Sequence, residues 1–253
     1  KTSGEEDRNQ IQPFFKGLLE LYQSELLSKG LKPATVNRRI GTLKHMFNKA
    51  NDWGMMTDEQ AQKLNKIKLL KENNKRLKYL SSEECRALLN ACPDYIKPIV
   101  ITAINTGMRK SEIFNLKWEN VDMKHGFIKL NPEETKSGKG REIPINQHME
   151  KVLTYQDSNR YDDSDYVFCS PVTCKPFKDI KRSFTSACNE AGIRGFRFHD
   201  LRHTFASQLV MAGAELASVQ KLLGHATINM TMRYSHLSPD HLKLAVDKLN
   251  DLI

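Results

Sequence analysis

A basic segment spanning residues 63–78 breaks the hydrophobic periodicity of this chain and separates it into two parts. The segment carries seven lysines and arginines against a single acid, Glu72, and the periodicity fails at residues 72–74. We interpret it as an interdomain linker that is itself attracted to a polyanion. The chain is therefore expected to form a helical domain with a basic linker over residues 1–75 and a second domain over residues 76–253.

The first part has the spacing of amphipathic helices. Apolar residues recur at three- and four-residue steps over residues 11–28, and a second stripe runs over residues 33–51, where Pro33 suits a first helical turn. The opposite face of the second helix is basic and has no acid. Such a face can lie along a phosphate backbone, although it can equally be a solvated surface. The predicted DNA contacts of this face and of the linker are Arg38, Arg39, Lys44, Lys66, Lys68, Lys75 and Arg76.

The second part mixes helices with a small sheet. Ser81 and Glu84 have the spacing of a capping box, and a helix around residues 94–106 should end at a glycine. Residues 126–130 and 141–145 have the composition of two short strands joined by a flexible turn. After them the pattern is helical to the end of the chain. The expected fold class is mainly α with a small β-sheet (α+β).

Composition narrows the classes of partner. The formal net charge is +9 and the isoelectric point about 9.2, which favours nucleic acid first and an acidic membrane surface second. Neither a run of about 18 apolar residues nor a signal peptide is recognisable, so we expect no membrane segment. The five cysteines form no CxxC pair, which argues against a disulfide framework and fits a reducing cytoplasm.

Three short segments carry residues suited to chemistry. The first, TGMRKSE, uses a glycine turn to deliver Arg109 to the start of a helix. The second, HDLRH, places His199, Arg202 and His203 at helical spacing. The third, LLGHATINMTMRY, has His225 after a helix-ending glycine and Tyr234 nine residues later. Taken singly, each segment has an ordinary structural explanation, and Tyr234 alone would be assigned to the core.

A zinc site is the main alternative for the second segment. Two histidines four residues apart on a helix can hold zinc, but the zinc hydrolases need a glutamate after the first histidine, where this chain has Asp200. Arg202 would also place a fixed cation beside the metal. We therefore expect no metal site, and we assign His203 a packing or structural role.

Together the segments resemble the tyrosine recombinase (phage integrase) family. The resemblance rests on TGMRKSE, TKSGKGREIPI, HDLRH, LLGH and TMRY in this order, and it covers residues 80–253 strongly. The first 75 residues resemble the family's helical core-binding domain more loosely. The extra arm-binding domain that many integrases carry at the N-terminus is not recognisable, and the chain does not begin with Met, so we expect that upstream sequence has been trimmed. The resemblance implies six catalytic residues: Arg109, Lys136, His199, Arg202, His225 and Tyr234.

Their chemistry suits phosphoryl transfer, in which positioning and charge stabilisation do most of the work. Arg109 and Arg202 are planar forks that can bind non-bridging phosphate oxygens, so neither a metal nor another cofactor is expected. Tyr234 is the predicted nucleophile and His199 the predicted base. The resemblance gives Lys136 the role of general acid, with Lys139 as the alternative lysine.

The two remaining polar residues of the expected site have supporting roles. His225 is expected to donate a hydrogen bond to a non-bridging oxygen, and Glu112 to orient Arg109 or the hairpin.

The implied activity is site-specific recombination through a 3′-phosphotyrosine, as in integration or excision of a mobile element. The implied partners are double-stranded DNA with specific attachment sites, three further copies of the chain in a homotetramer, and accessory DNA-bending factors, at the nucleoid of a bacterial or phage-infected cell. The apolar stripe over residues 240–253 is expected to dock on a neighbouring subunit. The alternatives are DNA relaxation by a type IB topoisomerase and a DNA-binding relative without catalysis.

Overall fold

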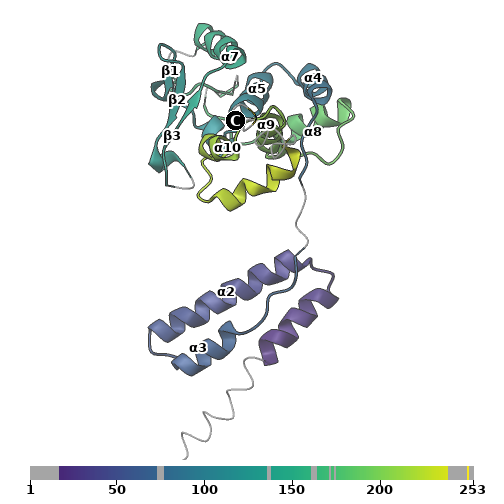
Figure 1. Cartoon of the computed structure of the whole chain (residues 1–253), viewed down its shortest axis with the longest axis vertical. Helices are drawn as coiled ribbons and strands as arrows, with labels where there is room; N and C mark the ends of the chain where they lie inside the picture. Colours follow the sequence, from purple (N-terminus) through teal and green to yellow (C-terminus); the bar gives the residue numbers. More distant parts are fainter. Residues whose placement is uncertain are drawn as a thin grey trace, which may run out of the picture. The chain divides into compact units, whose positions relative to one another are not determined.

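The computed structural model divides into two compact units, Lys1–Arg76 and Leu77–Ile253 (Figure 1). Each unit has hydrophobic cores of its own. No helix among the described residues is long and apolar enough to cross a membrane. The structure describes residues 17–72, 77–135, 138–160, 164–170, 172–173, 175–238 and 250.

Over its described residues, 17–72, the first unit contains three helices. They span residues 17–28, α2 Pro33–Asp52 and α3 Asp58–Asn65. Pro33 occupies the first turn of α2 as predicted, and a capping box between Thr57 and Gln60 starts α3. The helices enclose a small core of buried aliphatic side chains, so the two helices predicted in this part are confirmed where the structure describes them. The core residues are Leu19, Leu26, Val36, Ile40, Leu64 and Ile67.

The segment predicted as a linker begins inside this unit. Its first residues belong to α3, and Ile67 is buried against α2. The buried Asn37 pairs with the backbone of Leu70 in both directions, through Nδ2 to the Leu70 oxygen at 2.9 Å and from the Leu70 nitrogen to Oδ1 at 2.8 Å. The prediction that the linker starts at residue 63 is therefore wrong, because the apolar residues between its lysines pack on α2. Residues 73–76 lie outside the described part of the chain.

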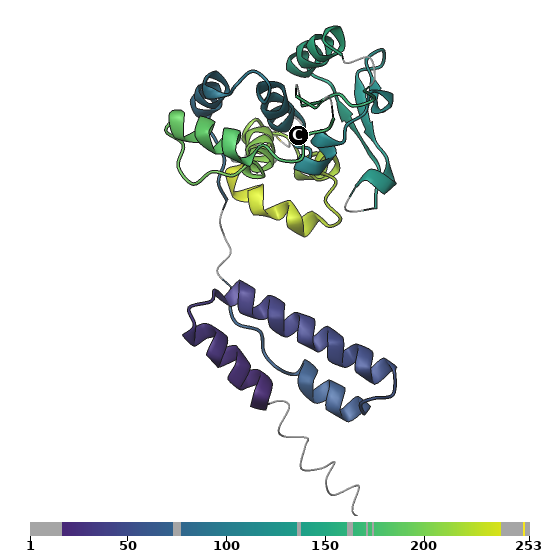
Figure 2. The same cartoon turned by 180° about the vertical axis from the view of Figure 1, so that it is seen from behind.

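The second unit places a small sheet at one side of a group of helices (Figures 1 and 2). In both views α7 lies beside the sheet, while α4 and α8 lie on the opposite side of α5 and α9. The predicted capping box of Ser81 and Glu84 starts α4 and is confirmed. The α-helices of the unit are α4 Ser82–Ala91, α5 Lys97–Thr106, α6 Lys110–Phe114, α7 Gln147–Ser158, α8 Lys181–Glu190, α9 Asp200–Met211 and α10 Leu216–Leu223.

The sheet is antiparallel with strand order β1-β2-β3. It comprises β1 Val121–Asp122, β2 Phe127–Leu130 and β3 Arg141–Pro144. Ile128 pairs with Ile143, and both side chains face the core. The two predicted strands are confirmed. The two-residue β1 was not predicted, since alternation cannot be recognised over so short a segment.

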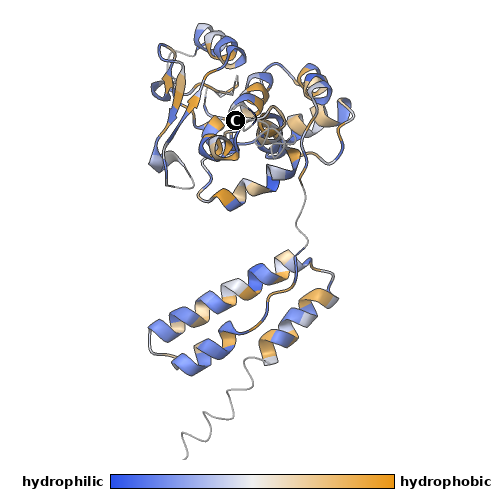
Figure 3. Cartoon of the chain, viewed as in Figure 1, coloured by the Kyte–Doolittle hydropathy of each residue, from blue (hydrophilic) through white to orange (hydrophobic). Residues whose placement is uncertain are grey.

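The α5 helix forms the centre of the second unit. Its side chains Ile99, Val100 and Ala103 are buried, and α9 packs along it. Figure 3 shows hydrophobic and hydrophilic residues mixed along most helices, as amphipathic packing requires. Contrary to expectation, the described residues between α7 and α8 are not helical, and they form isolated bridges such as Cys169 with Pro176. The fold class is mainly α with a small β-sheet, as predicted.

Three short 3-10 turns matter for the site that follows. They are η1 Trp118–Asn120 before β1, η3 Ile228–Met230 after α10, and η4 Met232–Leu237. A fourth, η2 Pro132–Glu134, precedes β3. The C-terminal helix predicted over residues 240–253 falls almost entirely outside the described residues.

Candidate active site

A glycine turn places Arg109, as the sequence predicts. The α5 helix ends at Gly107, whose φ of +60° is left-handed, and Arg109 is the N-cap of α6. The Arg109 backbone nitrogen donates to Glu112 Oε2 at 2.7 Å. Its guanidinium Nη1 donates to Glu112 Oε1, also at 2.7 Å. The arginine is therefore fixed at both ends by one carboxylate, and its Nη2 faces the Gly224 oxygen at 3.5 Å.

The same carboxylate also binds Arg141 on β3. Arg141 Nη2 donates to Glu112 Oε2 at 2.7 Å and Nη1 to Oε1 at 3.2 Å, while Nε donates to the Leu222 oxygen at 2.9 Å. The Glu112 side chain is 1% exposed and that of Arg141 6%. Burial raises the pKa of Glu112, but the bonds and charges of Arg141 and Arg109 outweigh it and hold this pKa below its usual value. Glu112 thus orients both Arg109 and the hairpin strand.

Arg202 is held by backbone carbonyls. It lies on α9 with 4% exposure, and Nη1 donates to the Gly107 oxygen at 2.6 Å, while Nη2 donates to the Leu223 oxygen. These oxygens belong to the C-terminal ends of α5 and α10, where the helix dipole is negative. Burial and the charges of Arg109 and Arg141 lower the pKa of Arg202 to about 9, so the group stays protonated at neutral pH.

His225 follows α10 directly. Gly224 ends that helix with φ +62°, and His225 Nδ1 lies 2.9 Å from Oγ1 of the buried Thr231. Burial, followed by the charges of Arg202 and Arg109, lowers the pKa of His225 to about 4. His225 is therefore neutral at physiological pH and stands beside both arginines.

Tyr234 is a buried residue of η4. Its side chain is 1% exposed and packs in a cluster with Phe205, Val219 and Leu223, and burial raises the pKa of Tyr234 to about 12. Its hydroxyl lies 2.6 Å from His203 Nδ1. We predicted a structural role for His203, and local spacing does not reveal this contact, because the two residues are 31 positions apart.

His199 stands next to this pair. It is the residue before α9, and its ring meets the edge of the His203 ring at 5.4 Å between centroids. Burial and the charge of Arg202 are the main causes that lower the pKa of His199. Arg109, His199, Arg202, His225 and Tyr234 are thus brought together from distant segments. Lys136, the sixth predicted residue, lies outside the described residues.

The predicted DNA contacts of the first unit have different environments. Arg38 and Arg39 are exposed on α2, and Lys66 and Lys68 are exposed after α3. Lys44 instead turns back, and its Nζ donates to the backbone oxygens of residues 65 and 67 at 2.9 and 2.7 Å. Its ammonium thereby stabilises the end of α3. Two further predicted contacts, Lys75 and Arg76, lie outside the described residues.

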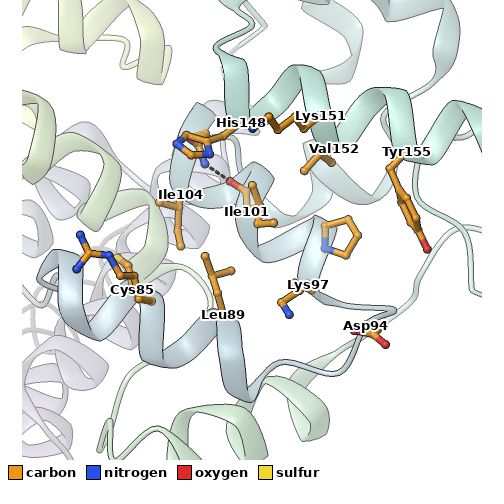
Figure 4. Close-up of a pocket in the computed structure, with 13 residues that line it drawn as sticks. Cys85, Leu89, Asp94, Lys97, Ile101, Ile104, His148, Lys151, Val152 and Tyr155 are labelled. Atoms are coloured by element: carbon orange, nitrogen blue, oxygen red, sulfur yellow. Dashed lines mark hydrogen bonds between the residues drawn. The ribbon is translucent and has the colours of Figure 1, made fainter.

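Two other candidate sites can be compared with this one. In the part of the chain that the structure describes, no three His, Cys, Asp or Glu side chains are placed to hold a metal ion, so the zinc alternative lacks ligands there. A cavity of about 750 Å³ lies between α4, α5 and α7, with Leu89, Ile101 and Val152 among its lining residues (Figure 4). None of the described site residues borders it.

The cluster around Arg202 can bind an anion next to a hydroxyl nucleophile. Two protonated guanidiniums offer planar donor pairs that match phosphate oxygens. Neutral imidazoles and a phenol supply groups that can exchange protons. This combination suits phosphoryl transfer, in which charge on the non-bridging oxygens must be stabilised.

Comparisons with known proteins agree with this chemistry. The chain is 34% identical over 227 residues to an integrase of Salmonella phage P22, covering 83% of this chain and 57% of that protein. It is 31% identical over 237 residues to tyrosine recombinase XerA of Pyrococcus furiosus, covering 90% of this chain and 79% of that protein.

A solved structure shares the fold. The Tn1549 transposon integrase, in complex with a circular intermediate DNA, superposes with a TM-score of 0.73 and 18% identity over 92% of this chain and 89% of that one. The model of the phage integrase family matches residues 78–241, well over half of the chain. The chain therefore belongs to the phage integrase family of tyrosine recombinases.

Proposed function

We propose that this protein is an enzyme that cuts and rejoins DNA at specific sites through a covalent bond between Tyr234 and a 3′ phosphate. The observation that carries the proposal is the convergence of Arg109, Arg202, His225 and Tyr234 from separate segments onto one buried site. Membership of the phage integrase family supports the same reaction. Because the chain spans only 57% of the P22 integrase, the activity of the whole protein is argued from this site.

The two arginines bind the scissile phosphate. Arg109 donates to the Gly224 carbonyl and Arg202 to the Leu223 carbonyl, so both guanidiniums lie at the C-terminal end of α10. The charge of Arg202 is available to a ligand because carbonyl oxygens hold it without neutralising it. The positive charge of Arg109 is partly neutralised, because Arg109 forms an ion pair with the Glu112 carboxylate. His225 is neutral and adds a hydrogen-bond donor to a non-bridging oxygen.

Tyr234 attacks the phosphorus, and the 5′ oxygen leaves. An imidazole beside Tyr234 accepts the phenolic proton, and a general acid protonates the leaving oxygen. Lys136 remains our proposal for that acid. Its neighbour Thr135 is buried and donates from Oγ1 to the Lys139 oxygen at 2.9 Å. No metal ion is needed, because the two guanidiniums stabilise the phosphate charge. No ATP is needed, because the phosphoester energy is retained in the link to tyrosine.

The partners follow from the same reaction. Exposed Arg38, Arg39, Lys66 and Lys68 provide a basic surface on the first unit for the DNA backbone. Strand exchange between two duplexes requires several active sites, so we propose a homotetramer on paired attachment sites, with the segment over residues 240–253 docking on a neighbour. Accessory DNA-bending factors belong to the same proposal.

The place of action is the DNA of a bacterial or phage-infected cell, where phage integrases work.

Two alternatives have less support. The family and relatives matched are integrases and recombinases, which gives no support to a type IB topoisomerase. A non-catalytic relative would have no reason to retain the whole set of site residues.

Trapping the covalent intermediate tests the proposal. The protein is mixed in EDTA with a pool of nicked suicide duplexes of random sequence, and SDS-resistant protein–DNA adducts are counted and sequenced. We expect adducts from the wild type and from Tyr155→Phe, which alters an exposed tyrosine on α7, but none from Tyr234→Phe. DNA binding without any adduct would contradict the proposed activity, and a metal requirement would contradict the mechanism.

A further inference from the structure

His203 holds the hydroxyl of the proposed nucleophile. Its Nδ1 lies 2.6 Å from Tyr234 Oη, and the two ring centroids are 5.9 Å apart. The contact joins α9 to η4, two elements that also pack against each other. Tyr234 itself is almost fully buried, so its hydroxyl bonds to the His203 imidazole in place of water. The residue in direct reach of the phenolic proton is therefore His203, one position after Arg202.

The surroundings of His203 keep its ring neutral. Burial is the main cause that lowers the pKa of His203 to about 4, followed by the charges of His199 and Arg233. Arg202 acts in the same direction, and Asp200 opposes it. A neutral imidazole has one nitrogen with a free lone pair. When the Tyr234 hydroxyl donates, Nδ1 is that nitrogen and Nε2 carries the ring proton.

We propose that His203 is the base that takes the proton of Tyr234 during DNA cleavage. The proposal rests on the function proposed above and assigns to His203 the role that the sequence suggests for His199. The His199 ring packs against the His203 ring in a T-shaped arrangement, whereas the hydrogen bond to the Tyr234 hydroxyl is made by His203. A general base needs a heavy-atom distance of about 2.6–3.2 Å to the proton donor, which the His203 contact satisfies.

The step balances in protons and bonds. Tyr234 Oη forms a bond to phosphorus while its O–H bond breaks, and the proton moves to His203 Nδ1 to give an imidazolium. The bond from phosphorus to the 5′ oxygen breaks, and that oxygen takes a proton from the general acid. In the rejoining step the imidazolium returns its proton to the tyrosine oxygen as the 5′ hydroxyl attacks.

DNA binding itself prepares this base. In the free protein, the cations of Arg202 and Arg233 disfavour a charged His203. A phosphodiester bound between the arginines adds a negative charge that offsets them, which raises the basicity of the imidazole. The proton transfer is therefore easiest when substrate occupies the site.

Asparagine provides the decisive substitution. In His203→Asn a carboxamide oxygen can stand near the position of Nδ1 and accept the Tyr234 hydroxyl, but it cannot take the proton. We expect His203→Asn and His203→Ala both to slow adduct formation by about 10²–10⁴-fold on a duplex sequenced from the wild-type trap. His199→Asn should slow adduct formation less than His203→Asn does. If His203→Asn formed adducts within threefold of the wild-type rate, His203 would only position the tyrosine.

A modified leaving group separates the base from the acid. A 5′-bridging phosphorothiolate leaves as a thiolate, whose conjugate acid has a pKa of about 8.5, and it needs no protonation. The defect of His203→Asn should persist on this substrate, whereas the defect of Lys136→Ala should be relieved. Relief of the His203→Asn defect by sulfur would overturn the proposal, because the histidine would then act on the leaving oxygen.

Two controls keep the result readable. NMR of nitrogen-labelled histidine in the wild type should show Nδ1 of His203 unprotonated, and a proton on Nδ1 would contradict the proposal even if the variants failed to fold. A wild type that forms no adduct would refute the proposed function itself. A wild type that forms adducts together with an undiminished His203→Asn would refute only the role of His203.

Discussion

The charge of Glu112 holds Arg109 and Arg141 in position in the proposed site. It is buried between two guanidiniums, so removing it leaves Arg109 and Arg141 facing each other without a counter-charge. Loss of one partner of a buried ion pair typically costs about 3–5 kcal/mol. We therefore expect Glu112→Ala to lower the free energy of unfolding by about 3 kcal/mol in urea titrations. This is the lower end of the range, because Arg109 is 18% exposed and water screens part of its charge.

A surface ion pair serves as the control for this residue. Glu83 lies 3.9 Å from Arg86 with both side chains more than 70% exposed. Water screens such exposed pairs, so Glu83→Ala should leave the unfolding midpoint nearly unchanged. Equal losses in the two variants would show that the Glu112 bridge does not stabilise the fold.

At the scale of elements, the end of α5 is the most constrained junction. Gly107 has φ +60°, and a Cβ there would lie 2.3 Å from Phe205 Cδ1 and 2.9 Å from Leu223 Cδ2. Alanine at such a φ costs about 1–2 kcal/mol even in open space. Gly107→Ala should cost more than that and should also slow adduct formation, because the Gly107 oxygen holds Arg202.

Gly126 provides the matched glycine for comparison. It has φ +75° in the same unit, with no atom within 4 Å of an added Cβ. Gly126→Ala should lose only the conformational contribution of about 1–2 kcal/mol and keep its adduct rate. Thermal unfolding and adduct trapping on both variants measure the difference, and equal behaviour would exclude a special role for the α5 junction.

Elements and residues differ in how far the sequence predicts them. The capping box of α4, the glycine stop of α5 and the two paired strands are local patterns, and each was predicted from its own residues. Arg141 and His203 were missed because their contacts are distant in sequence. Arg141 meets Glu112 and Leu222 across 29 and 81 positions, and His203 meets Tyr234 across 31. Spacing along one helix or strand carries no information about such partners.

The predicted start of the linker at residue 63 was wrong for a related reason. Lysines at Lys63, Lys66 and Lys68 suggested a solvated linker, yet Leu64 and Ile67 between them pack on α2. A charge run describes one face of a segment, and burial is decided by the other face.

At the scale of the molecule, the second unit should be sensitive to acid. The pKa values of His203 and His225 are lowered to about 4, below the 6.5 of an unfolded histidine. The unfolded chain therefore binds protons first, so stability is complete above pH 6.5 and is lost as the pH falls towards 4. We expect urea titrations to lose about 2–4 kcal/mol of unfolding free energy between pH 7.5 and 5.

Substitutions of single histidines test which residues cause this loss of unfolding free energy at low pH. His203→Asn should remove part of the pH dependence, whereas His125→Asn should retain it, since the His125 side chain is 68% exposed. A pH dependence that is the same in both variants would show that the buried histidines do not set the acid limit.

The backbone hydrogen bonds that hold Arg202 have a consequence for how the sequence of this protein can evolve. The partners of its guanidinium are the Gly107 and Leu223 carbonyls, which every amino acid supplies. No codon change can delete either acceptor, so substitutions around the arginine reach it only by displacing the ends of α5 or α10. Changes to the glycines that terminate the two helices should therefore be selected against, since they would displace these carbonyls.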